Sequence, residues 1–188
     1  MGHIERDYKP APAILKDRGH DIMVSWEGQN AGKIKINGVD YKLLQCHWHS
    51  PSEHKINGIT FDEELHILHQ DSKGVRAVIS VLFKIGSPDP FISKLFNHIK
   101  SLHPNEEKKL GIVDPGTIGF WSGKYYRYIG SLTIPPCTEG VVWTIFAHPK
   151  TLSAEQVQAL KEALSDESRE NARPIQHLHG RLVEASSH

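Results

Sequence analysis

Short apolar runs separated by turn residues dominate the hydrophobic pattern of this chain. Asn37-Gly38, which lies between two of these runs, is a strong signal for a β-hairpin. Ala77–Phe83 is almost continuously apolar, as expected of a strand that is buried on both faces. The runs rich in Val, Ile, Tyr and Trp predict strands over Asp21–Trp26, Lys33–Ile36, Tyr41–His49, Glu63–His69, Ala77–Ile85, Tyr126–Ser131 and Val141–His148.

Two other segments repeat their apolar residues at the spacing of an α-helix. These segments are Pro90–Leu102 and Ser153–Leu164. The second one opens with Ser153 and carries Gln156 three residues later, which is the sequence signature of a capping box. Neither an internal repeat nor a linker interrupts the pattern. We therefore expect a mainly β fold with a few surface helices, in a single domain that spans residues 1–188.

Composition and charge narrow the range of partners. The 188 residues include 22 basic and 22 acidic side chains, so the formal net charge is zero, and no run of like charges forms an interaction tail. No apolar stretch approaches the roughly 18–20 residues that span a bilayer. Residues 1–6 also lack the basic and then apolar profile of a signal peptide. We expect a soluble protein without a nucleic-acid or membrane partner.

Histidines supply the candidate chemistry. His47 and His49 occupy positions i and i+2 of a predicted strand, so their side chains share one face, and His66 can join them from a neighbouring strand. Three neutral imidazoles around one point suit a zinc ion that keeps a fourth position open. The chain has 13 histidines, so the spacing alone also allows half-buried strand histidines that hydrogen-bond to the backbone. Cys46 points to the opposite face and should pack as a small hydrophobic residue.

Three further blocks follow the histidine pair: Ser50-Pro51-Ser52-Glu53-His54, Gly130-Ser131-Leu132-Thr133-Ile134-Pro135-Pro136-Cys137 and Val141-Val142-Trp143. In this order and spacing, the blocks resemble the α-class carbonic anhydrases. Tyr8-Lys9-Pro10-Ala11 and Arg18-Gly19-His20-Asp21-Ile22 are most similar to the plant branch of the family. The resemblance runs from about residue 8 to about residue 176. It implies a large, twisted, mostly antiparallel central sheet with a zinc site in a central cleft.

The resemblance also implies an activity, the reversible hydration of carbon dioxide to bicarbonate and a proton. Its zinc ligands would be His47, His49 and His66. Zinc lowers the pKa of a bound water to about 7, a magnitude taken from carbonic anhydrase itself, and the resulting hydroxide attacks carbon dioxide. His20 matches the position of the proton shuttle, since a solvent-facing imidazole can relay protons to buffer. The alternative for His20 is an exposed histidine at the end of a strand.

Polar neighbours should hold the zinc ligands in place. Gln45 and Glu64 each lie two residues before a ligand, on the same strand face. The resemblance assigns both as acceptors of the ligand N–H groups, and it assigns the main-chain carbonyl of Asn171 to the third ligand. It also makes Thr133 the acceptor of a hydrogen bond from the zinc-bound hydroxide, and Glu53 the acceptor of a hydrogen bond from the Thr133 hydroxyl. Gln45 and Glu64 also have a simpler interpretation, as ordinary polar residues at a strand edge, and Thr133 has one as a turn residue.

Further residues of this chain match positions around the family's site, and we interpret them as structural residues or as contacts to the substrate. His54 and His69 match histidines that we expect to form structural hydrogen bonds. The apolar wall that holds carbon dioxide would consist of Leu68, Val78, Leu132, Val141 and Trp143, a role compatible with plain core packing.

The sequence departs from the family at several of its positions. Ile134 stands where the family usually has a polar residue, so it should narrow the substrate cavity. Arg18 and Met23 stand where some members use asparagines to order the proton-carrying water, and proton transfer should therefore be slower.

A segment containing Gln-Ser-Pro-Ile, which the family carries near its N-terminus, is absent from this chain. The usual disulfide partner of Cys137 is absent with it, and a bridge between Cys46 and Cys137 would need two strands to present both side chains to one side. We expect reduced stability and either a monomer or a homodimer. The compartment stays open, because a targeting segment would lie upstream of Met1; relatives are mostly secreted or plastid-targeted.

The family also includes plant storage or defence proteins with little hydratase activity. This is the alternative function for the chain. All three expected zinc ligands are present, which favours the enzyme.

Overall fold

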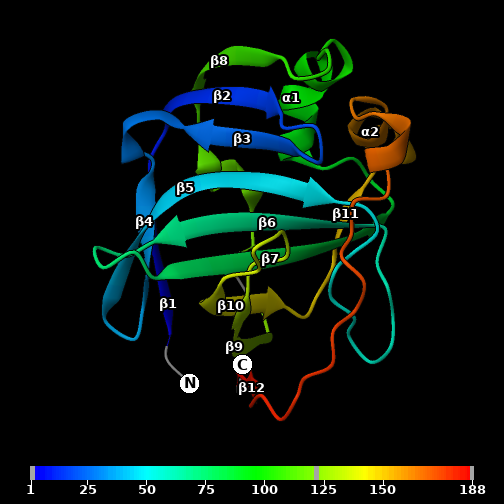
Figure 1. Cartoon of the computed structure of the whole chain (residues 1–188). Helices are drawn as coiled ribbons and strands as arrows, with labels where there is room; N and C mark the ends of the chain where they lie inside the picture. Colours follow the sequence, from blue (N-terminus) through cyan, green and yellow to red (C-terminus); the bar gives the residue numbers. More distant parts are fainter. Residues whose placement is uncertain (1–2, 121–122, 187–188) are drawn as a thin grey trace.

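The computed structural model describes residues 3–120 and 123–186, and these residues form one large sheet with helices packed against it (Figure 1). The strands are β1 (Ile4–Tyr8), β2 (Ala11–Asp17), β3 (Ile22–Trp26), β4 (Gly32–Ile36), β5 (Val39–His49), β6 (Glu63–Gln70), β7 (Arg76–Ile85), β8 (Glu107–Val113), β9 (Tyr125–Ser131), β10 (Glu139–Phe146), β11 (Lys150–Leu152) and β12 (Glu184–Ala185). The helices are α1 (Pro90–Lys100) and α2 (Ala154–Glu162), with short 3₁₀ turns at Glu27–Gln29, Pro115–Ile118 and Asp166–Ser168.

The sheet has the strand order β12-β9-β10-β7-β6-β5-β3-β2-β8. β4 joins β1 to β5 at one side, and β11 pairs with β7. Among the described strands, the pairs β7–β10 and β7–β11 are parallel and the other pairs are antiparallel. The predicted mainly β architecture with a mostly antiparallel central sheet is therefore confirmed.

The seven predicted strands are present with ends that move by one or two residues. The sequence pattern missed β1, β2, β8, β11 and β12. β2 contains Pro12, a residue type that is unusual inside a strand, and Pro12 is exposed while its neighbours Ala11 and Ala13 are buried. β8 is a strand of mixed composition at the edge of the sheet with no buried residue, so it lacks a strong apolar alternation.

Both predicted helices form, and their ends follow from capping. Asp89 accepts hydrogen bonds from the main-chain N–H groups of Phe91 and Ile92 at the start of α1. α2 begins with the predicted capping box, in which Ser153 and Gln156 bond reciprocally. The helices end before Leu102 and Leu164, at Lys100 and Glu162.

β7 separates two apolar clusters because its side chains alternate between the faces of the sheet. Ala77–Phe83 is at most 3% exposed, as its continuous apolar run predicted. One face packs into the larger core with α1 and α2. The other face contributes Val78 and Leu82 to a smaller cluster with Val141 and Trp143. Ser80 lies between them in sequence and on their face, so a polar position interrupts this smaller apolar surface.

Both cysteines are free. Cys46 is fully buried in the larger core, and burial raises the pKa of its thiol, as expected of a small hydrophobic residue. Cys137 is partly exposed. Within the described ranges, the helices are too short or too polar to cross a bilayer.

Candidate metal centre

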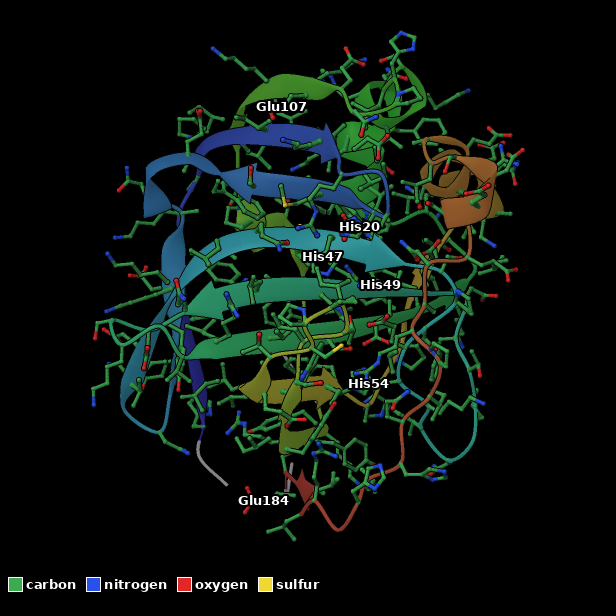
Figure 2. All side chains as sticks on the ribbon, viewed as in Figure 1. His20, His47, His49, His54, Glu107 and Glu184 are labelled. Atoms are coloured by element: carbon green, nitrogen blue, oxygen red, sulfur yellow. The ribbon has the colours of Figure 1, made fainter. Side chains whose placement is uncertain are left out.

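The register of β5 and β6 brings three histidines together. His47 pairs directly with His66, and His49 pairs with Glu64. Opposite residues of an antiparallel pair point to the same face, so the three imidazoles converge on one side of the sheet. Their ring centroids lie 4.5–5.3 Å apart, and one nitrogen of each ring lies within 4.8 Å of the others. Figure 2 labels His47 and His49 on β5.

Two of these imidazoles are oriented by residues of their own strands. Nδ1 of His47 donates a hydrogen bond to Oε1 of Gln45, at 2.8 Å. Nε2 of His66 donates to Oε1 of Glu64, also at 2.8 Å. In both cases the partner lies two residues earlier, as the shared strand face requires. These bonds leave Nε2 of His47 and Nδ1 of His66 available to a metal ion.

His49 receives its partner from a distant part of the chain. Its Nδ1 lies 3.3 Å from the main-chain oxygen of Asn171. Its Nε2 is buried and has no hydrogen-bond partner within the described residues. A buried nitrogen without a partner is costly unless it binds something, so this atom fits a metal ligand. The donor set of three histidines suits zinc.

The protonation of the cluster also fits a cation. Burial lowers the pKa of His47 well below its usual value, and the neighbouring His49, His66, Arg18 and His20 lower it further. Burial is also the main cause that lowers the pKa of His49. Both rings are therefore neutral at neutral pH, which is the form that binds a metal ion.

Glu64 is the buried acceptor at the base of the site. Its Oε2 accepts the main-chain N–H groups of Glu53 and His54, each at 2.8 Å. Its Oε1 accepts from Nδ1 of His54 at 2.6 Å, from His66 and from Oγ of Ser80 at 2.6 Å. Burial raises the pKa of Glu64, but His54 and His66 outweigh burial and hold it well below the usual value. With five donors on its two oxygens, Glu64 acts as an anchor for these groups and not as a metal ligand.

His54 extends this chain of hydrogen bonds outwards. The hydroxyl of Tyr128 lies 2.8 Å from Nε2 of His54. Burial lowers the pKa of His54, but the charge and hydrogen bond of Glu64 and the charge of Glu53 together outweigh burial and raise the pKa overall. The sequence analysis missed Tyr128 and Ser80. A signal existed for Ser80, because it is a small polar residue inside an otherwise apolar strand. Tyr128 lies on β9, and no local sequence pattern indicates that β9 comes close to the histidines.

Glu53 lies beside the histidines. Its Oε1 is 3.4 Å from Nδ1 of His49, and its Oε2 is 3.9 Å from Nδ1 of His66. The main-chain N–H of Arg173 donates to Oε1 at 2.7 Å. Burial raises the pKa of Glu53, and a hydrogen bond with the Thr133 side chain partly offsets this. Thr133 and Glu53 therefore lie close together and line the same cavity, although the sequence separates them by 80 positions.

His20 lies in the turn between β2 and β3, and Figure 2 shows it above the His47–His49 pair. Its side chain is 48% exposed, and its Nε2 is 3.5 Å from Oδ2 of Asp21. Arg18 binds the same carboxylate through two contacts, of 2.7 and 2.5 Å. Asn171 donates from Nδ2 to the main-chain oxygen of His20 at 2.8 Å. Asn171 thus connects the turn that carries His20 to His49.

The five residues expected to form an apolar wall fall into one cluster. Val78, Val141 and Trp143 are buried in the smaller hydrophobic cluster, with Leu68 and Leu132 packed against it. The remaining candidate, Ile134, is 38% exposed and lies outside the cluster.

A cavity of about 650 Å³ adjoins Glu53 and Thr133 on the side of the C-terminal segment. Tyr128 and Arg173 also line this cavity. Side chains of the segment 174–183 form its outer wall, which Figure 1 shows running from α2 to β12. Space therefore exists beside the Thr133–Glu53 pair.

Comparison with known proteins identifies the class to which this fold and site belong. The chain matches the family of eukaryotic-type carbonic anhydrases over residues 3–187, and it belongs to that family. It is 54% identical over 178 residues to alpha carbonic anhydrase 4 of Arabidopsis thaliana, a match that covers 95% of this chain and 66% of the relative. The chain thus spans about two thirds of the length of that relative.

Solved structures give the same result for the fold. The chain is similar to dioscorin complexed with ascorbate, with a TM-score of 0.94 and 42% identity over 98% of this chain and 78% of that one. It is also similar to the α-carbonic anhydrase from Thermovibrio ammonificans in complex with the inhibitor sulfanilamide. That match has a TM-score of 0.87 and 34% identity over 96% of this chain and 77% of that one.

Proposed function

We propose that this chain catalyses the reversible hydration of carbon dioxide with one zinc ion held by His47, His49 and His66. The observation that carries the proposal is the arrangement of three imidazole nitrogens within 4.8 Å of one another. On each ring the other nitrogen is hydrogen-bonded. When bound, zinc supplies a Lewis acid that makes water a nucleophile at neutral pH.

The neighbours of the histidines keep the rings in the form that binds a cation. Gln45 and Glu64 accept the N–H of two rings, and the Asn171 carbonyl accepts that of the third. Such contacts fix which nitrogen carries the proton and how the ring is oriented. Glu64 is itself held by donors from three other residues, so His66 has little freedom to turn away.

Thr133 and Glu53 orient the attacking oxygen in this proposal. In the proposal, the Thr133 hydroxyl donates a hydrogen bond to the Glu53 carboxylate, whose pKa the Thr133 side chain lowers. The hydroxyl oxygen is then free to accept a hydrogen bond from the nucleophile. A lone pair of the nucleophile is then directed at the carbon of the substrate. The main-chain N–H of Arg173 holds the carboxylate from the other side. The pair thereby positions the reactants, without transferring a proton itself.

His20 is proposed to relay the proton from the site to the solvent. Its ring is about half exposed, so it exchanges protons with buffer. Its charge also reaches the cluster, because it contributes to the lowered pKa of His47. The contact with Asp21 restrains the ring at the mouth of the site.

The uncharged substrate fits the apolar cluster beside the histidines. Trp143 contacts His66, with ring centroids 4.8 Å apart. Val78 and Val141 extend the same apolar surface. Carbon dioxide carries no net charge, so an apolar surface next to the nucleophile favours its binding. Ile134 is proposed to narrow the approach from the solvent side.

A second candidate function is a storage or defence protein with little hydratase activity. The similarity to dioscorin supports it, because the TM-score of 0.94 exceeds the 0.87 for the Thermovibrio ammonificans carbonic anhydrase. The complete set of three histidines supports the enzyme.

One experiment distinguishes the two candidate functions. Zinc content and carbon dioxide hydration are measured on one sample, with and without sulfanilamide, for the wild type and for His66→Ala. We expect one zinc per chain and hydration that sulfanilamide inhibits, both lost in His66→Ala. His98→Ala, at an exposed position of α1, is the matched control and should behave as the wild type. Stoichiometric zinc without inhibitable hydration would support the second candidate.

A further inference from the structure

A small cavity lies on the opposite side of β5 from the imidazoles, where α2 packs against the sheet. Trp48 and Glu63 line it from β5 and β6, Leu160 lines it from α2, and Ser50 and Asn171 line it from the segments that follow. Its volume is about 10 Å³. A space of this size admits a single water molecule and nothing larger.

Three buried polar atoms at this cavity lack a hydrogen bond among the described residues. They are Nε1 of Trp48 and both carboxyl oxygens of Glu63. Trp48 is 3% exposed and Glu63 is 1% exposed. Polar groups buried to this extent normally have a protein or water partner, because leaving them unpaired is costly.

Among the other polar residues of the cavity wall, Asn171 and Ser50 are already engaged. Lys161 and Arg169 also line the cavity, and among the described residues neither forms an ion pair with Glu63. Oδ1 of Asn171 accepts the main-chain N–H of Ser50 at 2.9 Å. Nδ2 of Asn171 donates to the main-chain oxygens of His20 and Trp48, at 2.8 and 3.1 Å. Oγ of Ser50 is 3.4 Å from the main-chain oxygen of Asp62. The Ser50 side chain therefore offsets part of the effect of burial on Glu63, but neither Ser50 nor Asn171 supplies a partner to Nε1 of Trp48.

We propose that this cavity binds one ordered water molecule that bridges Trp48 and Glu63. The indole N–H is a donor only, so the occupant must offer a lone pair. The carboxyl oxygens of Glu63 are acceptors, so the occupant must also offer a hydrogen. A metal ion offers no lone pair to the indole, and an anion offers no hydrogen to the carboxylate. Water satisfies both groups in the space present.

The electrostatics of Glu63 agree with this assignment. Burial raises the pKa of Glu63 well above its usual value, with smaller opposing effects from Lys161 and Ser50. Among the described residues, no ion pair joins Glu63 to Lys161 or to another cation. In either protonation state, Glu63 keeps a carboxyl oxygen that accepts a hydrogen from the water.

The location of the water gives it a positioning role. Trp48 lies between His47 and His49 in the chain and points to the opposite face of β5. Asn171, whose main-chain oxygen contacts His49, forms part of the same wall. A water that joins Trp48 to Glu63 therefore ties β5 to β6 directly behind the histidine cluster. The site itself does not depend on the metal or on the proposed activity.

NMR of the ¹⁵N-labelled full chain tests the proposal, through magnetisation transfer from water to the tryptophan indole N–H groups. We expect a cross-peak from a bound water to the indole of Trp48. The indoles of Trp26 and Trp143 are internal controls, because they donate directly to main-chain oxygens of Val113 and Ser131, at 3.0 and 2.9 Å. They should show no such cross-peak.

Variants and a crystal structure complete the test. Glu63→Gln retains an acceptor and should keep the Trp48 cross-peak, whereas Glu63→Leu fills the cavity with apolar atoms and should lose it. If Glu63→Leu does not fold, high-resolution density of the wild type decides, with a water expected within hydrogen-bond distance of both residues. A dry cavity, a metal ion, or a direct bond from Trp48 to Glu63 would overturn the proposal.

Discussion

Thr133 and Glu53 are the residues whose contact most directly links the fold to the proposed reaction. Replacing Thr133 with alanine removes the hydroxyl that orients the nucleophile, while the three histidines keep their own partners. We expect kcat/KM for carbon dioxide hydration to fall by about 10²-fold, as is typical for one orienting group, with zinc content unchanged. Stopped-flow hydration and metal analysis measure the two quantities. Thr138→Ala, at an exposed position of the same turn, should change neither.

His20 makes a separate prediction, because it acts on the proton and not on the carbon. His20→Ala should lower kcat in weak buffer, by up to about 10²-fold, and leave kcat/KM near the wild-type value. Added imidazole should restore kcat by carrying the proton from solution. Turnover in weak buffer that is the same in the variant and the wild type would contradict the shuttle role.

Local spacing made part of the site predictable at this scale. The pairs Gln45–His47 and Glu64–His66 follow from alternation along a strand, which depends only on positions i and i+2. Ser80, Tyr128 and Arg173 reach the same network from other segments, through pairing registers that no local pattern contains. Their contributions required the three-dimensional structure.

Among the elements, β1 shows how a strand without a clear pattern is held in place. The hydroxyl of Tyr8, at its end, lies 2.6 Å from Nε2 of His69 on β6. Nδ1 of His69 is 3.3 Å from the main-chain oxygen of Ala77, so Nε2 accepts the hydrogen from Tyr8. Tyr8→Phe leaves this nitrogen unpaired in the core.

We expect Tyr8→Phe to lower the free energy of unfolding by about 1–3 kcal/mol. Urea denaturation followed by fluorescence measures the change. Tyr126→Phe, on β9, is the control and should alter the free energy by less than about 0.5 kcal/mol. Equal stability of the Tyr8→Phe variant and the wild type would show that the contact with His69 contributes nothing net.

His69 also predicts how stability depends on pH. Burial lowers its pKa from 6.5 to about 3 in the folded state, so between these values the unfolded chain binds one more proton than the folded one. Stability contributed by neutral His69 is present above pH 6.5 and is lost as the pH falls towards 3, by up to about 1.4 kcal/mol per pH unit. Denaturation of metal-free protein from pH 7 to pH 4 should show a smaller slope for His69→Gln. An unchanged slope would contradict the lowered pKa.

The apolar pattern predicted the central strands because both their faces are buried. β5, β6 and β7 carry long apolar or alternating runs, and both helices carry an apolar stripe with a cap. The apolar pattern missed β2 because a proline interrupts the strand, and it missed β8 because lysines interrupt the run of apolar residues. Their place in the sheet comes from pairing with each other and with β3, which is a tertiary interaction.

At the scale of the whole molecule, the proposed metal should stabilise the fold, because its ligands come from two central strands and one of their supports, Asn171, comes from the C-terminal segment. A zinc concentration of about 1,000 times Kd stabilises the native state by about 4 kcal/mol. At roughly 2–4 °C per kcal/mol for a chain of this length, the shift in Tm is about 10 °C.

Differential scanning calorimetry with and without a zinc chelator measures this shift. His66→Ala is the control, since it should melt at the same temperature in both conditions. If the Tm of the zinc-loaded wild type does not change when the chelator is added, the idea that zinc binding stabilises the fold is contradicted. Assembly stays a prediction of a monomer or a homodimer, which sedimentation of the same samples distinguishes.

X-ray absorption at the zinc edge tests the central claim most directly, because it counts the atoms around the metal. The predicted spectrum contains three imidazole nitrogens and one further light atom, and sulfanilamide should replace that atom while the imidazole signals persist. Fewer than three imidazoles, or a fourth protein ligand that sulfanilamide does not displace, would contradict a zinc site built from His47, His49 and His66 with one exchangeable position.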